Sequence, residues 1–382
     1  MADIEKEREG WRNKAREVAR SVVAPRATEI DATGEFAWDI VDVFAQHGFL
    51  SLIIPKEYGG MDGDITSFCM VAEEMAIYCA TSSLLVIVQA VGTMPLVLGG
   101  TEELKKRFLP KLSKEKGLIC FCITEPEAGS DAASIRTKAI LKGDHYLLNG
   151  RKCFITNGGV SDLYTVFTVT SHEKKMEGIT GFVIEKGTPG LSVGKTEEKM
   201  GIRGSNTTEV ILEDVKVPVS QRIGDEGVGW WLMMRTLNRS RPAIGAQAVG
   251  LAQGALNYVI ENGKEKGWFK SKNGALGVQS KLADMAVEIE AARALVYKSA
   301  RMMDEKVKGT PVQMFSAMSK YFASDIAMKV TTEAVQILEW EGLTRNHPVE
   351  RMMRDAKVIQ IFEGTNQVQR LVVAHTLLKG KS

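Results

Sequence analysis

Three polar segments carry the residues whose types and spacing are best suited to chemistry. The first runs from Phe121 to Asp131, and it offers the hydroxyls of Thr124 and Ser130 together with free backbone amides around Gly129. A polar turn of this kind could bind a phosphate or the edge of a flavin ring. Taken alone, the segment is more simply an ordinary turn between two domains.

The second and third segments are also unremarkable when each is considered alone. Phe154 and Thr156 end a predicted strand just before a pair of glycines, as a hairpin end would. In the third segment Glu363 follows an apolar run and precedes Gly364, and Thr365 is placed to cap the next helix. Burial against the apolar run would raise the pKa of Glu363 toward that of a general base. An isolated Glu-Gly-Thr is more simply a solvated loop beside a helix start.

The elements that must position these segments change type twice along the chain. Apolar residues recur at helical spacing from Glu7 to about Leu118, alternate with period two in the middle, and return to helical spacing after Pro218. Turns at Gly143-Asp144 and Asn149-Gly150 are predicted to join the first three strands as hairpins. The predicted strands are 138–142, 145–148, 151–156, 163–170, 181–185 and 207–217, and the predicted later helices are 230–238, 242–263, 278–306, 311–338 and 367–379.

This order predicts three domains and no alternation of strand and helix. We expect a helical domain over 1–118, a middle antiparallel β domain, barrel-like or sandwich-like, over 119–221, and a C-terminal helical bundle over 222–382. GxGxxG, GxxxxGK[ST] and HExxH motifs are absent from the sequence. The commonest nucleotide and zinc motifs are therefore excluded.

Composition indicates an ordinary globular protein with a small-molecule partner. Of the 382 residues 44% are hydrophobic and 25% are charged, and the formal net charge is only +2 without a polybasic run, which argues against a dedicated nucleic-acid binder. The cysteines are odd in number and lack CxxC spacing, so we expect reduced thiols and no metal site. They are Cys69, Cys79, Cys120, Cys122 and Cys153.

One uncharged stretch, Met75 to Thr101, is long enough to cross a bilayer. We interpret it as a pair of buried core segments rather than a membrane span, because Gly92 and Pro95 interrupt it and no basic or aromatic flank frames it. The charged N-terminus lacks the apolar run of a signal peptide. Because Met1 begins directly on a domain-like helix, we expect the bacterial cytoplasm, with the mitochondrial matrix as the alternative.

Together the three segments resemble the acyl-CoA dehydrogenase family. Its motifs Thr-Glu-Pro-x-Ala-Gly-Ser-Asp, Phe/Trp-Ile-Thr-Asn and Glu-Gly-Thr-x-Gln-x-x-Arg occur in this order at 124–131, 154–157 and 363–370. The likeness continues at 54–60, 199–205, 241–242 and 281–285, and so covers nearly the whole chain. It implies an N-terminal helical domain, a middle β domain and a C-terminal four-helix bundle. It also implies FAD as cofactor and a homotetramer, a dimer of dimers, with FAD at subunit and domain interfaces.

The resemblance further implies a role for each site residue. Glu363 would be the catalytic base. The residues implied in FAD binding are Phe121, Ile123, Thr124, Gly129, Ser130, Phe154, Thr156, Gln336, Thr365 and Gln367. Those implied in acyl-CoA binding are Ser130, Asn238, Arg241 and Gly364.

The chemistry implied is α,β-dehydrogenation of an acyl-CoA thioester to the enoyl-CoA, within carboxylic or fatty acid metabolism. In the family the base N–H and a flavin hydroxyl polarise the thioester carbonyl, the base removes the α-proton, and the β-hydrogen leaves as hydride to the flavin. An electron-transferring flavoprotein is the expected acceptor. Two alternatives remain: a flavin oxidase of the same fold that uses oxygen, and a catalytically silent acyl-CoA-binding or assembly protein.

Three positions depart from the family pattern. Ser240 stands where some members place the base, so Glu363 is the one base candidate from the family's two places. Residues 265–269, Glu-Lys-Gly-Trp-Phe, replace the Arg-x-x-Phe-Gly offered to the neighbouring subunit's FAD. Gln336 and Gly342 are kept, but the bulky Glu339 and Trp340 lie between them. We expect an altered intersubunit part of the FAD site.

The substrate is predicted from the segment that would form the pocket floor, Leu84 to Val88, which is wholly apolar. A terminal carboxylate would be stranded there, so a short, branched or alicyclic acyl group is favoured over a dicarboxylic one. Trp230, Trp231 and Trp340 favour a compact acyl group, unless they are simply core aromatics.

Overall fold

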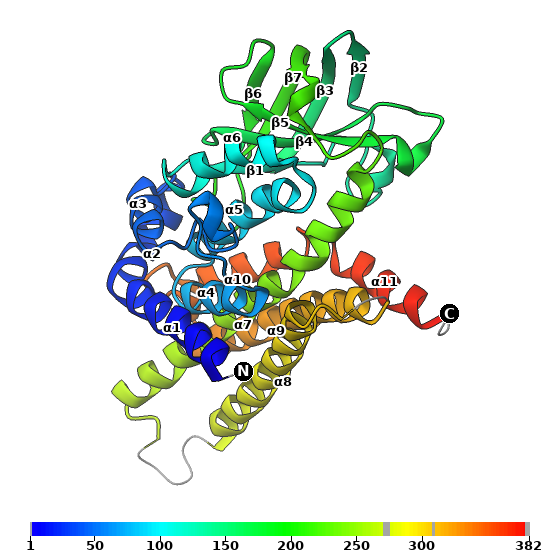
Figure 1. Ribbon diagram of the computed structural model, residues 1–382. Coiled ribbons are helices and arrows are strands. Elements are labelled where there is room, and N and C mark those ends of the chain that lie inside the picture. Colours follow the sequence, from blue (N-terminus) through cyan, green and yellow to red (C-terminus); the bar gives the residue numbers. More distant parts are fainter. Residues whose placement is uncertain (1, 270–275, 308–309, 379–382) are drawn as a thin grey trace.

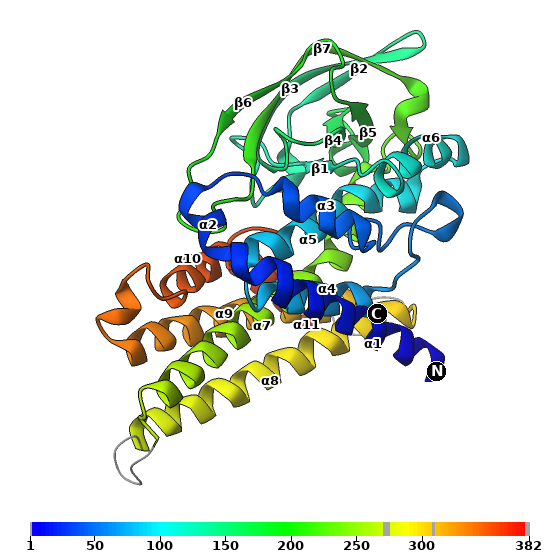
Figure 2. The same ribbon diagram turned by 90° about the vertical axis from the view of Figure 1, so that its left-hand side faces the viewer.

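The computed structural model describes residues 2–269, 276–307 and 310–378. Helices, a β domain and a second set of helices follow one another along the chain, which confirms the predicted fold class. Figure 1 shows the β domain at the top, the long helices α7, α8 and α9 below it, and the N-terminal helices packed beside both. Figure 2, turned by 90°, shows α5 lying between the β domain and the lower helices.

The N-terminal region wraps around one central helix, α5. Buried residues run without interruption from Ala80 to Leu96 of this helix. Gly92 and Pro95 do not break it as predicted, and Pro95 lies inside it. The helices of this region are α1 (Ala2–Val18), α2 (Ala24–Thr33), α3 (Trp38–Gln46), α4 (Ile65–Ala76), α5 (Ala80–Gly99) and α6 (Glu102–Ser113).

By length and composition alone α5 could cross a membrane, and 83% of its apolar window is buried inside the protein. Gly92 lets α5 approach the first strand closely, because a Cβ at this position would lie 2.9 Å from Cγ2 of Ile119. Gln89 adds two hydrogen bonds at the same contact, donating to the Gly117 carbonyl at 2.9 Å and accepting from the Ile119 N–H at 3.2 Å. The helix is thus fixed to the β domain by polar and apolar contacts.

The middle domain is one curved sheet with both antiparallel and parallel pairings. Its strand order is β6-β7-β3-β2-β4-β5-β8, and β1 pairs with β4 in parallel register. A single parallel register pair also joins β2 to β4. The strands are β1 (Ile119–Cys122), β2 (Lys138–Lys142), β3 (His145–Thr156), β4 (Leu163–Val169), β5 (Ile179–Glu185), β6 (Leu191–Thr196), β7 (Thr207–Pro218) and β8 (Arg222–Ile223).

Only one of the two predicted hairpin turns forms. Gly143-Asp144 joins β2 to β3, and Gly143 has the positive φ of +64° that such a turn requires. The turn predicted at Asn149-Gly150 is wrong, because β3 runs straight through it with a register shift there. Both halves of β3 pair with the long strand β7, and the Asn149 side chain bonds Asp214 on that strand, so pairing overrides the local turn preference.

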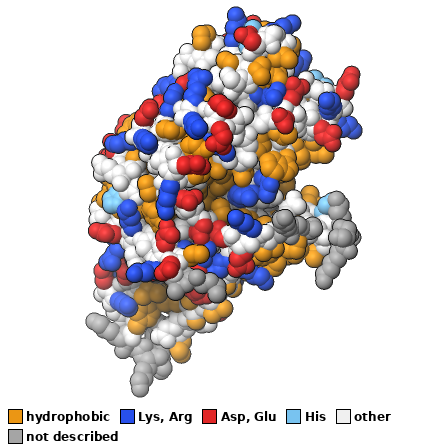
Figure 3. All heavy atoms as spheres, in the orientation of Figure 1, with side chains coloured by type: hydrophobic (Ala, Val, Ile, Leu, Met, Phe, Trp, Pro, Cys, Tyr) orange, Lys and Arg blue, Asp and Glu red, His pale blue; other side chains and the backbone are white. Residues whose placement is uncertain are grey.

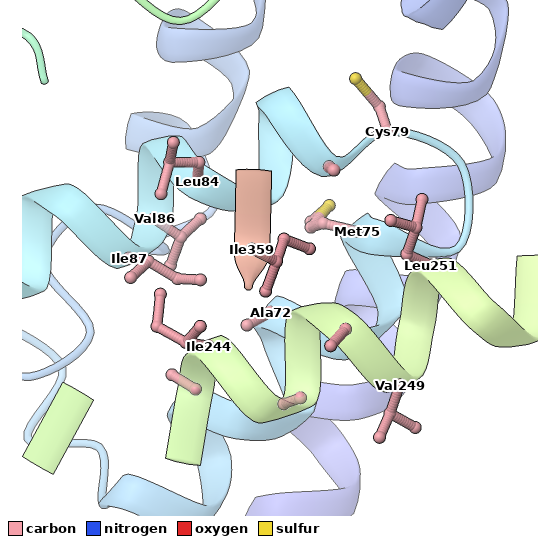
Figure 4. Close-up of a cluster of buried hydrophobic side chains, with 14 of the residues drawn as sticks. Ala72, Met75, Cys79, Leu84, Val86, Ile87, Ile244, Val249, Leu251 and Ile359 are labelled. Carbon is pink, nitrogen blue, oxygen red and sulfur yellow. The ribbon is translucent and has the colours of Figure 1, made fainter. Parts of the chain in front are cut away.

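The C-terminal region is a bundle of long helices. The helices are α7 (Gly229–Glu265), α8 (Leu276–Asp304), α9 (Thr310–Leu338), α10 (Val349–Ile359) and α11 (Asn366–Leu378). Figure 4 shows where this bundle meets the N-terminal region: Ile244 and Leu251 of α7, Ile87 of α5 and Met75 of α4 surround Ile359 at the end of α10. Ile359 is fully buried there, so the chain just before Glu363 is anchored in the core.

A single helix, α7, replaces the two helices predicted on either side of Pro242. Proline has no N–H, so the carbonyl four residues earlier, that of Asn238, loses its helical donor. The hydroxyl of Ser316 on α9 donates to that carbonyl at 2.7 Å instead. The neighbouring helix therefore satisfies the group that the proline leaves free.

Replacement of this hydroxyl gives a test of that compensation. We expect Ser316→Ala to lower the free energy of unfolding by about 1–3 kcal/mol, because the Asn238 carbonyl is left without a partner. In a Pro242→Ala background, which restores a backbone N–H, the same substitution should cost much less. A double-mutant cycle by denaturant unfolding measures the difference, and equal costs in both backgrounds would contradict the assignment.

Candidate active site

Glu363 lies in the short loop between α10 and α11. Thr365 caps α11, accepting a hydrogen bond from the Val368 N–H at 3.3 Å as predicted. Glu363 has φ of +57° and Gly364 has φ of +89°, and for a glutamate this left-handed conformation is strained. A side chain at Gly364 would also clash with the amide of Gln369. The loop therefore holds Glu363 in an unusual, tightly defined conformation.

Glu363 is half-buried, and its carboxylate is hydrogen-bonded to α7. The Ser240 hydroxyl donates to Oε2 of Glu363 at 2.9 Å. Burial raises the pKa of Glu363, and the Ser240 hydrogen bond and the charges of Arg241 and Lys320 oppose that rise. A carboxylate is suited to general-base catalysis when its pKa is raised but neighbouring donors and cations still stabilise its ionised form.

Arg241 and Asn238 accompany this carboxylate on α7. Nη1 of Arg241 donates to Oδ1 of Asn238 at 2.9 Å, and burial lowers the pKa of Arg241 to about 10 against the opposing charge of Glu363. The Nε atom of Arg241 is buried and has no hydrogen-bond partner in the described part of the chain. A Cβ atom added to Gly364 would lie 3.9 Å from Nη2 of Arg241, so the two residues are neighbours. Four predicted site residues, Asn238, Arg241, Glu363 and Gly364, thus form one cluster.

The two predicted segments of the β domain also lie side by side. The Cys153 N–H donates to the Thr124 carbonyl at 2.9 Å, next to Phe154. Phe154 is 62% exposed, although a large apolar side chain is normally buried, and its φ is +54°. Its neighbour Thr156 is half-buried, and Gly129 and Ser130 are exposed on the adjoining loop.

This arrangement fits the ring of a flavin. An exposed aromatic, the nearby threonines Thr124 and Thr156, and an exposed glycine-containing loop offer both polar and apolar groups, which we call the flavin-ring surface. The side-chain amide of Asn157, at the end of the same motif, is buried and has no hydrogen-bond partner among the described residues. In the view of Figure 3, hydrophobic side chains gather between the β domain and the helices below it.

The sequence analysis missed a buried ion pair, Lys152 with Glu125, that contacts the backbone just before Thr124. Lys152 is fully buried, and its Nζ donates to Glu125 at 2.7 Å and to the Ile123 carbonyl at 2.9 Å. Glu125 also accepts from the N–H groups of Arg136 and Thr137. Burial lowers the pKa of Lys152, opposed by Glu125, and the Lys152 charge and these hydrogen bonds lower the pKa of Glu125 against burial.

The remaining predicted FAD residues come from several elements, and among them Ile123 is buried next to Thr124. Phe121 is half-buried and packs edge-on against Phe167 at 5.3 Å between ring centroids. Gln336 near the end of α9 and Gln367 on α11 are exposed, and no hydrogen bond joins either to the β-domain segments in the described residues. Within the described residues, one cluster joins Glu363, Gly364, Asn238 and Arg241, and a second joins the segments of Thr124 and Phe154.

The two segments that depart from the family pattern contact each other. Lys266 forms an ion pair with Glu341, and Trp268 is half-buried beside Phe269. Trp340 is 71% exposed and Trp231 is 48% exposed, so neither encloses a pocket within one chain. Trp231 and Trp340 are therefore not core aromatics, whereas Trp230 is half-buried and packs against the core that contains Leu232. That these side chains favour a compact acyl group stays a prediction.

The cysteine thiols lie inside the protein. All five cysteines are free and buried. The two on β1, Cys120 and Cys122, place their sulfur atoms 3.6 Å apart. No group of three or more His, Cys, Asp or Glu side chains able to hold a metal ion occurs within residues 2–269, 276–307 and 310–378.

Models of the acyl-CoA dehydrogenase N-terminal, middle and C-terminal domains match residues 5–116, 120–215 and 227–378. The chain belongs to the acyl-CoA dehydrogenase family. It is an oxidoreductase of that family with the family's three-domain architecture.

Two relatives and two solved structures match almost the whole chain. "Probable acyl-CoA dehydrogenase FadE25" of Mycobacterium tuberculosis is 45% identical over 98% of this chain and 96% of its own. Cyclohexane-1-carbonyl-CoA dehydrogenase of Geobacter metallireducens is 43% identical over 95% of each. Butyryl-CoA dehydrogenase from Megasphaera elsdenii superposes with a TM-score of 0.93 at 40% identity, covering 99% of each chain. A chain in a structure of the electron transferring flavoprotein of Acidaminococcus fermentans gives 0.93 at 39% identity, covering 97% and 98%.

The buried pair behind the flavin surface allows a stability test. We expect Lys152→Met to lower the free energy of unfolding by about 3–5 kcal/mol, because Glu125 would be left as a buried charge without its partner. Lys195→Met is the matched control, since Lys195 pairs with Glu197 at the surface and should change stability little. Chemical denaturation measures both, and a Lys152 variant as stable as the control would contradict the role of the pair.

Proposed function

We propose that this protein catalyses FAD-dependent α,β-dehydrogenation of an acyl-CoA thioester to the enoyl-CoA, with Glu363 as the base. The observation that carries the proposal is the half-buried Glu363 carboxylate, hydrogen-bonded to Ser240 and clustered with Arg241 and Gly364. Family membership along the whole chain supports it. The exposed Phe154 and its neighbours supply a surface for the flavin ring.

The chain's own residues have two tasks in this reaction. The α-proton of a thioester is weakly acidic, so a donor must stabilise the developing oxyanion. The Glu363 N–H suits this role, because no hydrogen bond from it is found in the described part of the chain. The Glu363 carboxylate then receives the α-proton at one of its oxygens. FAD, when bound, supplies the acceptor for the β-hydride.

We further propose Phe121, Ile123, Thr124, Gly129, Ser130, Phe154, Thr156, Gln336, Thr365 and Gln367 as FAD contacts. For the acyl-CoA we propose Ser130, Asn238, Arg241 and Gly364. Gln336 lies apart from the flavin-ring surface of its own chain, so we assign it to the FAD of a second subunit in a homotetramer. Exposed apolar side chains at Trp340, Leu343 and Leu371 support such an assembly.

The acyl group is proposed to be short, branched or alicyclic and without charge. Leu84 to Val88 on α5 are all buried among apolar neighbours, with exposures of 9% or less. A relative acts, by its name, on cyclohexane-1-carbonyl-CoA. An electron-transferring flavoprotein is the proposed acceptor, supported by the similar chain found in a structure of such a protein.

Substitution of the base tests the mechanism. We expect Glu363→Gln to bind the thioester but to bleach the flavin at least about 100-fold more slowly than wild type, because the amide cannot accept the proton. Anaerobic stopped-flow mixing at the flavin absorbance measures this, and thioester titration measures binding. Normal turnover by this variant would remove the base assignment.

A panel of thioesters tests the substrate class. We expect cyclohexane-1-carbonyl-CoA or butyryl-CoA to bleach the flavin anaerobically, and glutaryl-CoA to bleach it far more slowly, because its carboxylate would be buried beside α5. Mixing the reduced enzyme with oxygen is the companion measurement. Rapid reoxidation would favour an oxidase, and a protein that stays colourless with added FAD would favour a silent binding protein.

A further inference from the structure

Lys320, on α9, is a buried cation that the proposed chemistry does not yet use. Its side chain is fully buried, and its Nζ donates to the Gly364 carbonyl at 2.8 Å and to Oδ1 of Asn366 at 2.9 Å. No carboxylate forms an ion pair with it within the described residues. A buried ammonium is costly unless its surroundings compensate it, so its two acceptors and the nearby charges require an explanation.

Both acceptors belong to the loop that carries the base. Glu363 and Gly364 have positive φ angles, and such a backbone persists only where the surroundings hold it. Lys320 fixes the Gly364 carbonyl directly. It also fixes Asn366, whose side chain is held from α9 by Ser324 at 2.8 Å and by Asp325 at 2.7 Å. The strained loop is therefore fastened to α9 at its middle and at its end.

The charges around Glu363 are unequal. Arg241 faces it from α7, and Lys320 and Asp325 face the loop from α9. Asp325 is paired with Arg370 of α11 at 2.5 Å. Because Asp325 is paired with Arg370, two cations, Arg241 and Lys320, remain beside the single carboxylate of Glu363. Burial lowers the pKa of Lys320 to about 7, and the Glu363 charge opposes that fall, so the two groups sense each other.

We propose that Lys320 is a positioning residue for the base: its ammonium holds the Gly364 carbonyl so that Glu363 keeps one orientation, and its charge keeps that carboxylate ionised. The inference rests on the proposed function, because it concerns the same proton abstraction. Lys320 touches neither substrate nor flavin in this assignment. It acts through the Glu363 loop alone.

Two variants separate the hydrogen bond from the charge. Lys320→Gln keeps a donor and loses the charge, and Lys320→Met loses both. Ser324→Ala is the matched control, because the Ser324 hydroxyl also donates to Oδ1 of Asn366, at 3.1 Å, but carries no charge and forms no hydrogen bond with Gly364 among the described residues. The FAD-loaded proteins are mixed anaerobically with the thioester that bleaches wild type fastest, across a pH series.

Removal of the positive charge should raise the pKa of Glu363, so the acid limb of the bleaching rate should move upward by about one pH unit in both Lys320 variants. The rate itself should fall about 10- to 100-fold in Lys320→Met and less in Lys320→Gln, because misplacement of the base slows the chemical step. Thioester binding should stay within about threefold of wild type, which a general loss of structure would not allow. Ser324→Ala should leave the acid limb in place.

An unmoved acid limb and rate in both Lys320 variants would overturn the inference, as would an equal shift in Ser324→Ala. If neither Lys320 variant folds, the wild type and Glu363→Gln decide by ¹³C NMR of the lysine Cε atoms. The lysine that titrates near neutral pH should do so at lower pH in Glu363→Gln, because coupling between two charges is reciprocal. An unchanged titration would overturn the inference.

The two proposals fail in different ways. If no acyl-CoA bleaches the wild-type flavin, the proposed function fails. If wild type is bleached and the Lys320 variants show an unchanged pH profile, the function stands and only the role of Lys320 is lost.

Discussion

A carboxylate that takes a proton from carbon must lie where water is excluded and must still be ionised, and burial alone opposes the second requirement. Glu363 is half-buried, and its immediate neighbours meet the second requirement. The Ser240 hydroxyl bonds the carboxylate, and the buried cations Arg241 and Lys320 offset part of the desolvation. Both cations come from long helices, α7 and α9, whose packing fixes them. The arrangement of the bundle thus determines the charge state of one side chain.

The need to hold Glu363 in one place also gives a reason for the contacts that α10 makes with all three regions of the chain. Arg354 bonds Asp31 of α2 at 2.6 Å and the Met200 carbonyl of the β domain at 2.8 Å. Asp355 accepts the Ile202 N–H from the same β-domain loop. The helix then ends at the buried Ile359, four residues before Glu363. A shift of the β domain relative to the helices would therefore be transmitted to the Glu363 loop.

The sequence predicted the parts of this arrangement that depend on local pattern. Helical and strand periodicity located most elements, and motif order identified the three segments that carry Glu363, Thr124 and Phe154. It failed where a distant partner overrides a local preference. Pro242 stays inside α7 because Ser316 replaces its missing donor, and Gly150 stays inside β3 because β7 pairs on both sides of it.

The charged residues around the site were beyond sequence pattern for a similar reason. Lys320 occurs in an otherwise uncharged stretch of a helix, Met314 to Ala323, and nothing local shows that it faces a loop more than forty residues later. Lys152 and Glu125 are separated by a hairpin, and only the folded sheet makes them partners. For Lys320 a lone charge in an apolar run is the local signal, and it predicts burial with a partner without identifying that partner.

The uncharged character of α5 links substrate choice to the fold itself. Its apolar segment Leu84 to Val88 leads directly into Gln89 and Gly92, which fasten the helix to β1 beside the flavin-ring surface. The Thr165 hydroxyl of β4 donates to the Gly92 carbonyl at 2.8 Å and strengthens the same joint. A cation introduced into this helix to receive a carboxylated acyl chain would lie in the most buried element of the N-terminal region, where an unpaired charge is unfavourable. The proposed preference for an uncharged acyl group would therefore follow from the use of one apolar helix both as pocket floor and as the connection between two domains.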